Sequence, residues 1–216
     1  MEHYSNTKLR DYYLKYEDGL AVLDLNGKSL FLVLNAVTEL SETEKLVLDK
    51  HNLIELPASI IKLKNLVVLK LDKNKITELP SEISDLRKLR ELSPKNNQLV
   101  GLPTCIQKLN RLQWLHLDGN NLSELPAEIG DLKKLMVLKV SNNQLVGLPT
   151  SIQKLNRLEW LYLVGNELTQ LPAEIGDLNE LKSLSVSGNP LTVDAIKFAL
   201  TLEKRGLSTD IAGEDK

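Results

Sequence analysis

The stretch LQWLHLDGNNLSELPAEIGDLKK, residues 112–134, decides the fold of this chain, because most of the sequence repeats its pattern. With Leu112 as position 1, apolar residues fall at positions 1, 4, 6, 11, 14, 18 and 21, an asparagine stands at position 9, and a proline stands at position 15. The period is 23 residues without insertion, and the repeats begin at Leu20, Thr43, Leu66, Leu89, Leu112, Leu135, Leu158 and Leu181. A fixed period of this length indicates stacked repeats, each of which buries its apolar side chains against its neighbours.

Each repeat predicts one short strand and one short helix. Positions 3 to 5 are expected to be extended, so positions 4 and 6 share one face, and stacking would pair these segments into a parallel sheet on the concave side. We expect the asparagine at position 9 to bond backbone groups of its own and the next repeat, which would otherwise be buried and unpaired. Proline at position 15 suits the start of a short helix on the outer side, since it donates no hydrogen bond and its φ is fixed.

The motif L-x-x-L-x-L-x-x-N-x-L, followed by L-P-x-x-I-x-x-L, resembles that of leucine-rich repeat proteins over residues 20–191. This resemblance implies an α/β solenoid of eight 23-residue turns with a parallel concave sheet. The L-P-x-x-I variant is similar to that of small bacterial leucine-rich repeat proteins and of intracellular scaffolds that act on Ras-like GTPases. The resemblance therefore implies a protein partner, with a small GTPase or signalling protein as one candidate, and no cofactor.

Both ends of the chain depart from the repeat. Residues 1–19 carry leucine and tyrosine at helical spacing, and Gly19 would end such a helix, so we expect an N-terminal helical cap. A tyrosine-rich docking or phosphorylation segment is the alternative. Residues 192–207 are expected to form a C-terminal helical cap with Thr192 as its N-cap, and residues 208–216 a flexible tail.

Three repeats are irregular. The first has Lys28 at the asparagine position and Val33-Leu34 in place of Leu-Pro, and the second has His51 at the asparagine position, where we interpret it as a structural substitute. In the fourth repeat Pro94 occupies position 6, an inward strand position. Proline has no N–H for the sheet, so we predict a local irregularity there that costs about 0.5–1.5 kcal/mol. A functional kink is the alternative.

Composition limits the function classes. The formal net charge of −2 argues against general binding to nucleic acid or to anionic membranes. Cys105 is the single cysteine, which favours a reducing compartment, and neither a secretory signal nor a membrane-spanning run is recognisable. We therefore expect a cytoplasmic monomer with no membrane insertion. A secreted effector without a Sec signal is the alternative.

The most informative residues are those expected on the concave face, at positions 3, 5 and 7. Both tryptophans of the chain fall at position 3, two repeats apart. Exposed apolar patches mark contact surfaces, and tryptophan and tyrosine are enriched at binding hot spots. The candidate partner-binding residues are Trp114, His116, Asp118, Val137, Lys139, Trp160, Tyr162 and Val164. The alternative is that the tryptophans only shield the sheet, or are alike because residues 97–117 and 143–163 are near duplicates.

Catalytic signals are weak. His3, His51 and His116 have no Cys, Asp or Glu at metal-ligand spacing, so no catalytic residue and no metal site are predicted. The predicted function is a non-enzymatic protein-protein interaction module, acting as an adaptor, a regulator or a bacterial effector. Recognition of a glycan or other non-protein ligand on the same aromatic patch is the alternative.

Overall fold

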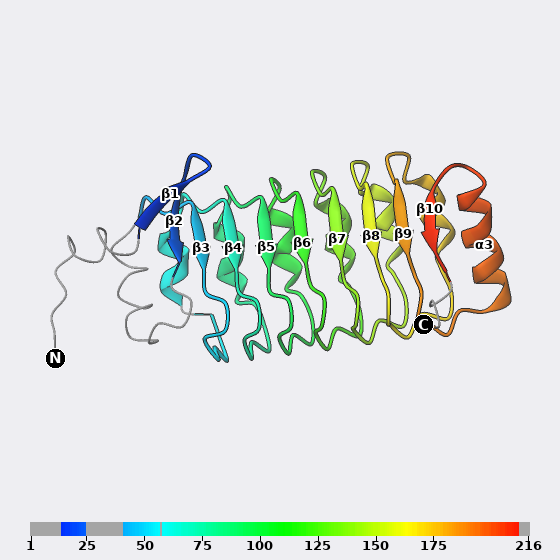
Figure 1. Ribbon diagram of the computed structural model, residues 1–216, viewed down its shortest axis with the longest axis horizontal. Helices are drawn as coiled ribbons and strands as arrows, with labels where there is room; N and C mark the ends of the chain where they lie inside the picture. Colours follow the sequence, from blue (N-terminus) through cyan, green and yellow to red (C-terminus); the bar gives the residue numbers. More distant parts are fainter. Residues whose placement is uncertain (1–13, 25–40, 57, 212–216) are drawn as a thin grey trace, which may run out of the picture.

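The computed structural model describes residues 14–24, 41–56 and 58–211, which form one elongated stack (Figure 1). Within these residues, ten strands make a single sheet in sequence order, from β1 to β10. Strands β2 to β10 are parallel to one another, and β1 pairs with β2 in the antiparallel direction. The strands are β1 (Leu14–Glu17), β2 (Leu20–Asp24), β3 (Lys45–Val47), β4 (Val68–Lys70), β5 (Glu91–Ser93), β6 (Trp114–His116), β7 (Val137–Lys139), β8 (Trp160–Tyr162), β9 (Ser183–Ser185) and β10 (Ser208–Asp210). The predicted parallel sheet, with strands at positions 3 to 5, is confirmed.

Short 3-10 helices line the opposite, convex side of the stack. They are η1 (Ala58–Lys62), η2 (Ser81–Asp85), η3 (Thr104–Lys108), η4 (Ala127–Asp131), η5 (Thr150–Lys154) and η6 (Ala173–Asp177). Helix η4 begins directly after Pro126, whose φ of −65° and ψ of 150° are those of an extended residue before a helix. The role predicted for the proline at position 15 is therefore confirmed, except at Pro57, which lies outside the described residues.

The core lies between the sheet and the 3-10 helices. Leu112, Leu115, Leu117 and Leu122, at positions 1, 4, 6 and 11, have no exposed surface, and neither has Ile129 at position 18. Each fully buried leucine or isoleucine contributes roughly 1.5–3 kcal/mol. These side chains pack against the equivalent residues of adjacent repeats, so stability comes from the stack rather than from one repeat.

A ladder of buried asparagines holds the loops after the strands. The Nδ2 of Asn120 donates to the carbonyls of Pro94 (3.0 Å) and Leu117 (2.9 Å), and its Oδ1 accepts from the N–H of Leu99 (3.0 Å). The same pattern recurs at Asn74, Asn97, Asn143, Asn166 and Asn189. The predicted role is confirmed, but the neighbour is the preceding repeat, not the next, because each loop turns its position-6 carbonyl and position-11 N–H toward the repeat that follows.

The prediction of an N-terminal helix that ends at Gly19 is wrong for the described residues, because Leu14–Glu17 form a strand. Strand β1 pairs with β2 as a hairpin, and the turn consists of Asp18 (φ 50°) and Gly19 (φ 78°). Asp-Gly with two positive φ angles matches the twist of a two-residue hairpin, and this turn preference outweighs the helical spacing of the tyrosines. The hairpin supplies an edge partner for the first parallel strand. Residues 1–13 lie outside the described part, as do Lys28, Val33 and Leu34.

The C-terminal helix is confirmed as α3 (Val193–Glu203), and the Oγ1 of Thr192 accepts from the N–H of Ala195 at 3.3 Å. The flexible tail predicted for residues 208–216 is wrong for Ser208–Asp210, which form β10. An unpaired edge on β9 would leave backbone groups exposed, and β10 satisfies them, for example with the bond from the N–H of Val186 to the carbonyl of Asp210 (2.8 Å). Residues 212–216 lie outside the described part.

Pro94 produces the predicted irregularity. Strand β5 is in register with β6 at two residues, whereas β6 and β7 are in register at three. Elsewhere the position-6 N–H donates to the position-5 carbonyl of the next repeat, as from Leu117 to Lys139 (2.7 Å). Pro94 has no N–H, so the carbonyl of His116 does not receive this bond.

His51 fills the asparagine position of the second repeat in a different way. Its own backbone N–H donates to the Oδ1 of Asn74 (2.9 Å), while its Nε2 is buried without a hydrogen-bond partner among the described residues. The groups that an asparagine would bond in the preceding repeat belong to residues 25 and 30, which are not described.

Candidate functional site

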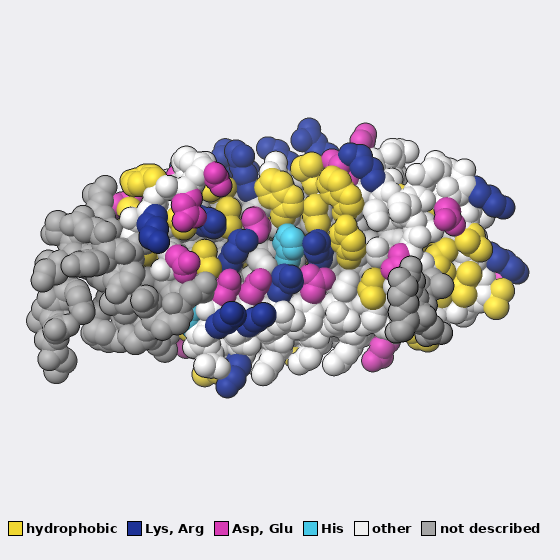
Figure 2. Space-filling view, in the orientation of Figure 1, with side chains coloured by type: hydrophobic (Ala, Val, Ile, Leu, Met, Phe, Trp, Pro, Cys, Tyr) yellow, Lys and Arg dark blue, Asp and Glu magenta, His cyan; other side chains and the backbone are white. Residues whose placement is uncertain are grey.

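Strands β6, β7 and β8 place the candidate residues on the concave face. The middle residue of each strand, Leu115, Leu138 or Leu161, points into the core and has no exposed surface. The flanking residues of each strand therefore point to the opposite, concave face. Figure 2 shows hydrophobic side chains gathered over the middle of this face, with a histidine beside them.

The strand register orders these residues into two rows. Trp114, Val137 and Trp160 are direct neighbours across β6, β7 and β8, and form what we call the tryptophan row. The tyrosine row, from the other end of the same strands, consists of His116, Lys139 and Tyr162. Six of the eight residues predicted from the sequence are thus brought together by strand pairing alone.

In the tryptophan row, the rings are partly exposed and the residue between them is not. Val137 retains 8 % of its surface, while Trp114 and Trp160 are of intermediate exposure. The Nζ of Lys182 lies 5.2 Å from the ring centroid of Trp160, and it also forms an ion pair with Glu159. Lys182 was not predicted as a site residue, because it stands at position 2 of its repeat and not at position 3, 5 or 7. Its signal was a long cationic side chain one strand away from a tryptophan.

The tyrosine row combines a cation with a neutral imidazole. The Nζ of Lys139 lies 5.1 Å from the ring centroid of Tyr162, within the range of a cation–π contact. His116 is partly buried, and this burial lowers the pKa of its imidazole below the usual 6.5, with a further lowering from the nearby charge of Lys139. The neutral form of His116, which offers one donor and one acceptor, is therefore favoured at pH 7.

The two remaining predicted residues lie at position 7, just beyond the strands. The Oδ1 of Asp118 accepts the backbone N–H of Ser141 at 3.1 Å, so this carboxylate has a structural role in joining two repeats. The N–H of Asp72 is bound by Asp49 in the same way (2.7 Å), and burial raises the pKa of Asp49. Val164 is partly exposed below the tyrosine row.

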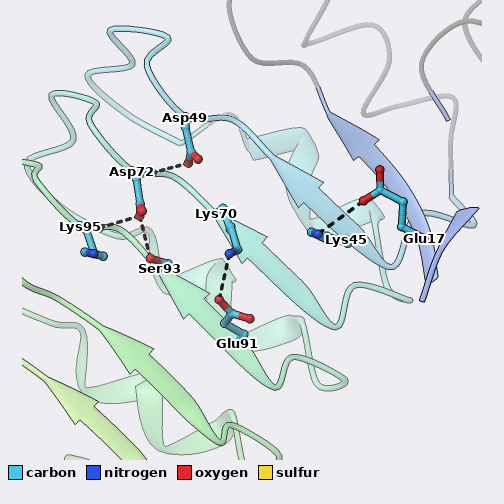
Figure 3. Close-up of polar contacts among 8 residues, drawn as sticks. All are labelled: Glu17, Lys45, Asp49, Lys70, Asp72, Glu91, Ser93 and Lys95. Atoms are coloured by element: carbon cyan, nitrogen blue, oxygen red, sulfur yellow. Dashed lines mark hydrogen bonds and ion pairs between the residues drawn. The ribbon is translucent and has the colours of Figure 1, made fainter. Parts of the chain in front are cut away.

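Toward the N-terminal end, the concave face carries charges that neutralise one another (Figure 3). Lys70 pairs with Glu91 at 3.4 Å, and Lys45 pairs with Glu17 at 3.8 Å. The Oδ1 of Asp72 accepts both the hydroxyl of Ser93 (2.7 Å) and the N–H of Lys95 (3.1 Å). Lys45 and Lys70 are therefore paired with carboxylates, and the carboxylate of Asp72 is occupied by hydroxyl and backbone donors.

No group of three or more His, Cys, Asp and Glu side chains in the described part of the chain is placed to hold a metal ion. Among the described residues, no helix has both the length and the apolar character that a membrane-spanning helix requires.

Comparison with protein families identifies the repeat. A model described as leucine-rich repeat region matches residues 104–204, and a model described as leucine rich repeat matches residues 41–99. A search of curated proteins finds no match to this chain.

Solved structures give the same result. A leucine-rich repeat protein of Leptospira interrogans is 35 % identical with a TM-score of 0.80, and the match covers 89 % of this chain and 49 % of that protein. An internalin of Listeria monocytogenes (inlF) is 20 % identical with a TM-score of 0.76, and the coverage is 97 % and 58 %. The leucine-rich repeat domain of the type III effector XopL is 25 % identical with a TM-score of 0.72, and the coverage is 91 % and 77 %. This chain spans about half the length of the first two proteins. Because the internalin is only 20 % identical, its similarity shows the fold alone.

Proposed function

The chain belongs to the leucine-rich repeat family, and we propose that it is a non-enzymatic module that binds another protein on its concave face around Trp114 and Trp160. Leucine-rich repeat domains are typically protein-interaction modules, and their stacked strands create an extended concave binding surface. The observation that carries the proposal is the pair of rows on β6 to β8, where aromatic side chains adjoin in register.

Two of the three rings, those of Trp160 and Tyr162, have cation–π contacts within the protein before a partner binds. Val137 is buried between the two tryptophans, and Lys182 and Lys139 lie near the rings of Trp160 and Tyr162. Side chains that are already ordered lose less conformational entropy on binding, so more of the contact energy is available for affinity. Tryptophan and tyrosine in such settings are the residue types that dominate binding energies.

The electrostatics favour an apolar side chain of the partner over the tryptophan row. The charge of Lys182, beside Trp160, is paired with Glu159, so the tryptophan row adjoins no unpaired charge of this residue. In the neighbouring tyrosine row, the lowered pKa of His116 favours its neutral form at pH 7. Covering an unpaired charge would cost desolvation energy, and an apolar contact on the tryptophan row avoids most of that cost. The committed charges beside β3 to β5 would then border the contact rather than form its centre.

The proposal is tested by partner capture with matched variants. A tagged protein carrying Trp114→Ala and Trp160→Ala is compared with the wild type in pull-downs from a cell lysate, followed by affinity measurement with the captured protein. We expect each tryptophan to contribute about 2 kcal/mol or more, so each single variant should lose a factor of roughly 30 in Kd, and the double variant a factor of roughly 700.

The matched control replaces Val100 and Val146 by alanine. Both are 63 % exposed, lie off the strands, and belong to the same near-duplicate segments, residues 97–117 and 143–163, that contain the two tryptophans. The control should keep the captured protein, and all variants should keep the circular dichroism spectrum of the wild type. Undiminished capture by the tryptophan variant contradicts the proposal. Tryptophan-dependent binding on a glycan array, without a captured protein, would favour the glycan alternative.

The single cysteine fits action in a reducing compartment. We place the module in a cytoplasm, either that of its own cell as an adaptor or regulator, or that of a host as a delivered effector. The type III effector XopL, whose leucine-rich repeat domain is 25 % identical, supports the second setting. The compartment of the captured partner separates the two.

A further inference from the structure

Basic side chains recur at position 23 in four consecutive repeats, directly before the strands of the concave patch. These residues, which we call the basic ladder, are Lys88, Arg111, Lys134 and Arg157. Each lies three residues before the first residue of its strand, β5, β6, β7 or β8. The ladder begins one strand before the tryptophan and tyrosine rows and ends with them, because position 23 holds Asn65 before β4 and Glu180 before β9.

The ladder is exposed, and most of its charge is not neutralised internally. All four side chains are exposed, and Arg111, Lys134 and Arg157 form no ion pair with any other residue of the described ranges. The Nζ of Lys88 donates to the neutral amide oxygen of Asn65 at 2.8 Å. This differs from Lys45 and Lys70 on the concave face, each of which forms an ion pair with a glutamate.

The ladder adjoins the aromatic rows in space. Each ladder residue lies three residues before its strand, so the ladder borders the start of β5 to β8. Figure 2 shows Lys and Arg side chains, with a few Asp and Glu side chains among them, along the upper edge of the molecule, next to the hydrophobic side chains over the middle of the concave face. The whole chain carries a net charge of −2, so this edge is a local concentration of positive charge and not a sign of overall basicity.

We infer that the basic ladder binds an acidic, extended segment of the partner protein, whose carboxylates meet Arg111, Lys134 and Arg157 while an adjoining apolar side chain covers the tryptophan row. This inference rests on the proposed function and names the chemistry of the partner. Arginine guanidinium groups bind carboxylates through two parallel hydrogen bonds, which fixes orientation as well as charge.

The dimensions agree with a short peptide segment. Neighbouring strands lie about 4.8 Å apart, so the four rungs span roughly 14 Å, and an extended chain covers this distance in about four to five residues. A segment with several Asp or Glu residues within that length can meet every rung.

A nucleic acid or an anionic membrane fits less well. Both present phosphates over a length much greater than the ladder, and would also meet Glu180 at its end and Glu159 beside Arg157. A short peptide segment with a few carboxylates can match the length of the ladder, so it need not extend to these glutamates.

Selection from a random peptide display library tests the inference. The immobilised targets are the wild type, a ladder variant (Arg111→Gln, Lys134→Gln and Arg157→Gln), and a control variant (Lys62→Gln, Lys108→Gln and Lys204→Gln). The control residues are exposed, lie on η1, η3 and the end of α3, and change the net charge equally. We expect Asp and Glu to be enriched on the wild type and on the control, and the enrichment to disappear on the ladder variant.

A selected peptide, synthesised with a fluorescent label, supplies the magnitude. Each exposed ion pair contributes a factor of roughly two to three, so the ladder variant should bind it about tenfold more weakly, and the difference should shrink in high salt. Circular dichroism verifies that the three proteins are folded alike.

The results separate the inference from the proposed function. Selected peptides that lack Asp and Glu, or whose acidic enrichment persists on the ladder variant, overturn the inference. If the Trp114→Ala and Trp160→Ala variant no longer selects those peptides, the proposed function still stands. If that variant selects them as well as the wild type does, both fail. Ladder-dependent binding that is tighter to a single-stranded oligonucleotide or to phosphatidylserine vesicles than to the peptide also overturns the inference.

Discussion

Replacing Pro94 by valine should stabilise the protein, because it restores a hydrogen bond that the sheet lacks. At every other parallel step from the second to the eighth repeat, the position-6 N–H donates to the position-5 carbonyl of the next strand, at 2.7–2.9 Å. Pro94 interrupts this series, and the carbonyl of His116 is left without its strand donor. Valine occupies the same position in the duplicated repeat, as Val140, where it has no exposed surface.

The magnitude follows from two opposing effects. A backbone hydrogen bond to an acceptor inside the sheet contributes about 1.5 kcal/mol, the upper part of the usual range. Removing proline gives the unfolded chain more conformations, which costs about 0.7 kcal/mol of stability. The net gain is about 0.8 kcal/mol, and for a chain of this size it corresponds to a rise in Tm of about 2–3 °C.

Urea unfolding and differential scanning calorimetry measure the change in stability. The slope of the unfolding free energy against urea concentration should be the same in the variant and the wild type. The reciprocal control, Val140→Pro, removes the bond from the N–H of Val140 to the carbonyl of Tyr162 (2.9 Å) and should lower stability by about 1 kcal/mol or more. An unchanged or lower Tm for Pro94→Val would refute the reasoning, since it would mean that the backbone around β5 is already adapted to proline.

Two further predictions concern one pair of glycines and one histidine. Gly130→Ala should destabilise the protein by about 1–3 kcal/mol in urea unfolding, because the new Cβ would lie 2.2 Å from the carbonyl oxygen of Ser151. In Gly176→Ala the new Cβ would meet nothing closer than 3.9 Å, so this variant should gain about 0.4–1 kcal/mol of stability. Equal effects of the two substitutions would contradict this difference in packing. The lowered pKa of His116 means that the unfolded chain binds its proton more readily, so the unfolding free energy should fall as the pH drops from 7 to 5 through the usual 6.5 and then the folded pKa. His116→Gln should reduce this fall, and an identical pH dependence in both proteins would argue against burial of the imidazole.

The ends of the stack show why some of the fold escaped prediction. Inside the stack, each repeat meets neighbours with the same pattern, so local spacing and tertiary environment agree. At the ends, a strand edge needs backbone partners that no repeat supplies, and residues outside the pattern provide them. The hairpin turn at Asp18 and Gly19 and the strand Ser208–Asp210 answer this need. The helical spacing of the residues before Gly19 predicted a helix instead, and the absence of the repeat pattern after residue 207 predicted a flexible tail.

The candidate site divides in the same way. Strand periodicity and a constant repeat length place Trp114, Val137 and Trp160 side by side, and both are legible in the sequence. The sequence also places Lys182 one strand away from Trp160, but whether its ammonium reaches the ring depends on the rotamers of both long side chains, which only the tertiary structure shows. The sequence also could not reveal that Asp118 is committed to the backbone of Ser141.

The sequence by itself therefore determined the period, the inward and outward faces, and the row of tryptophans, because these follow from local geometry repeated at a constant interval. Only the tertiary structure decided how the ends are closed, which charges pair, and which remain open to a partner, as those of Arg111, Lys134 and Arg157 do among the described residues. The physical reason is that edge pairing and charge pairing depend on which groups lie across the gap between repeats, and no single repeat contains that information.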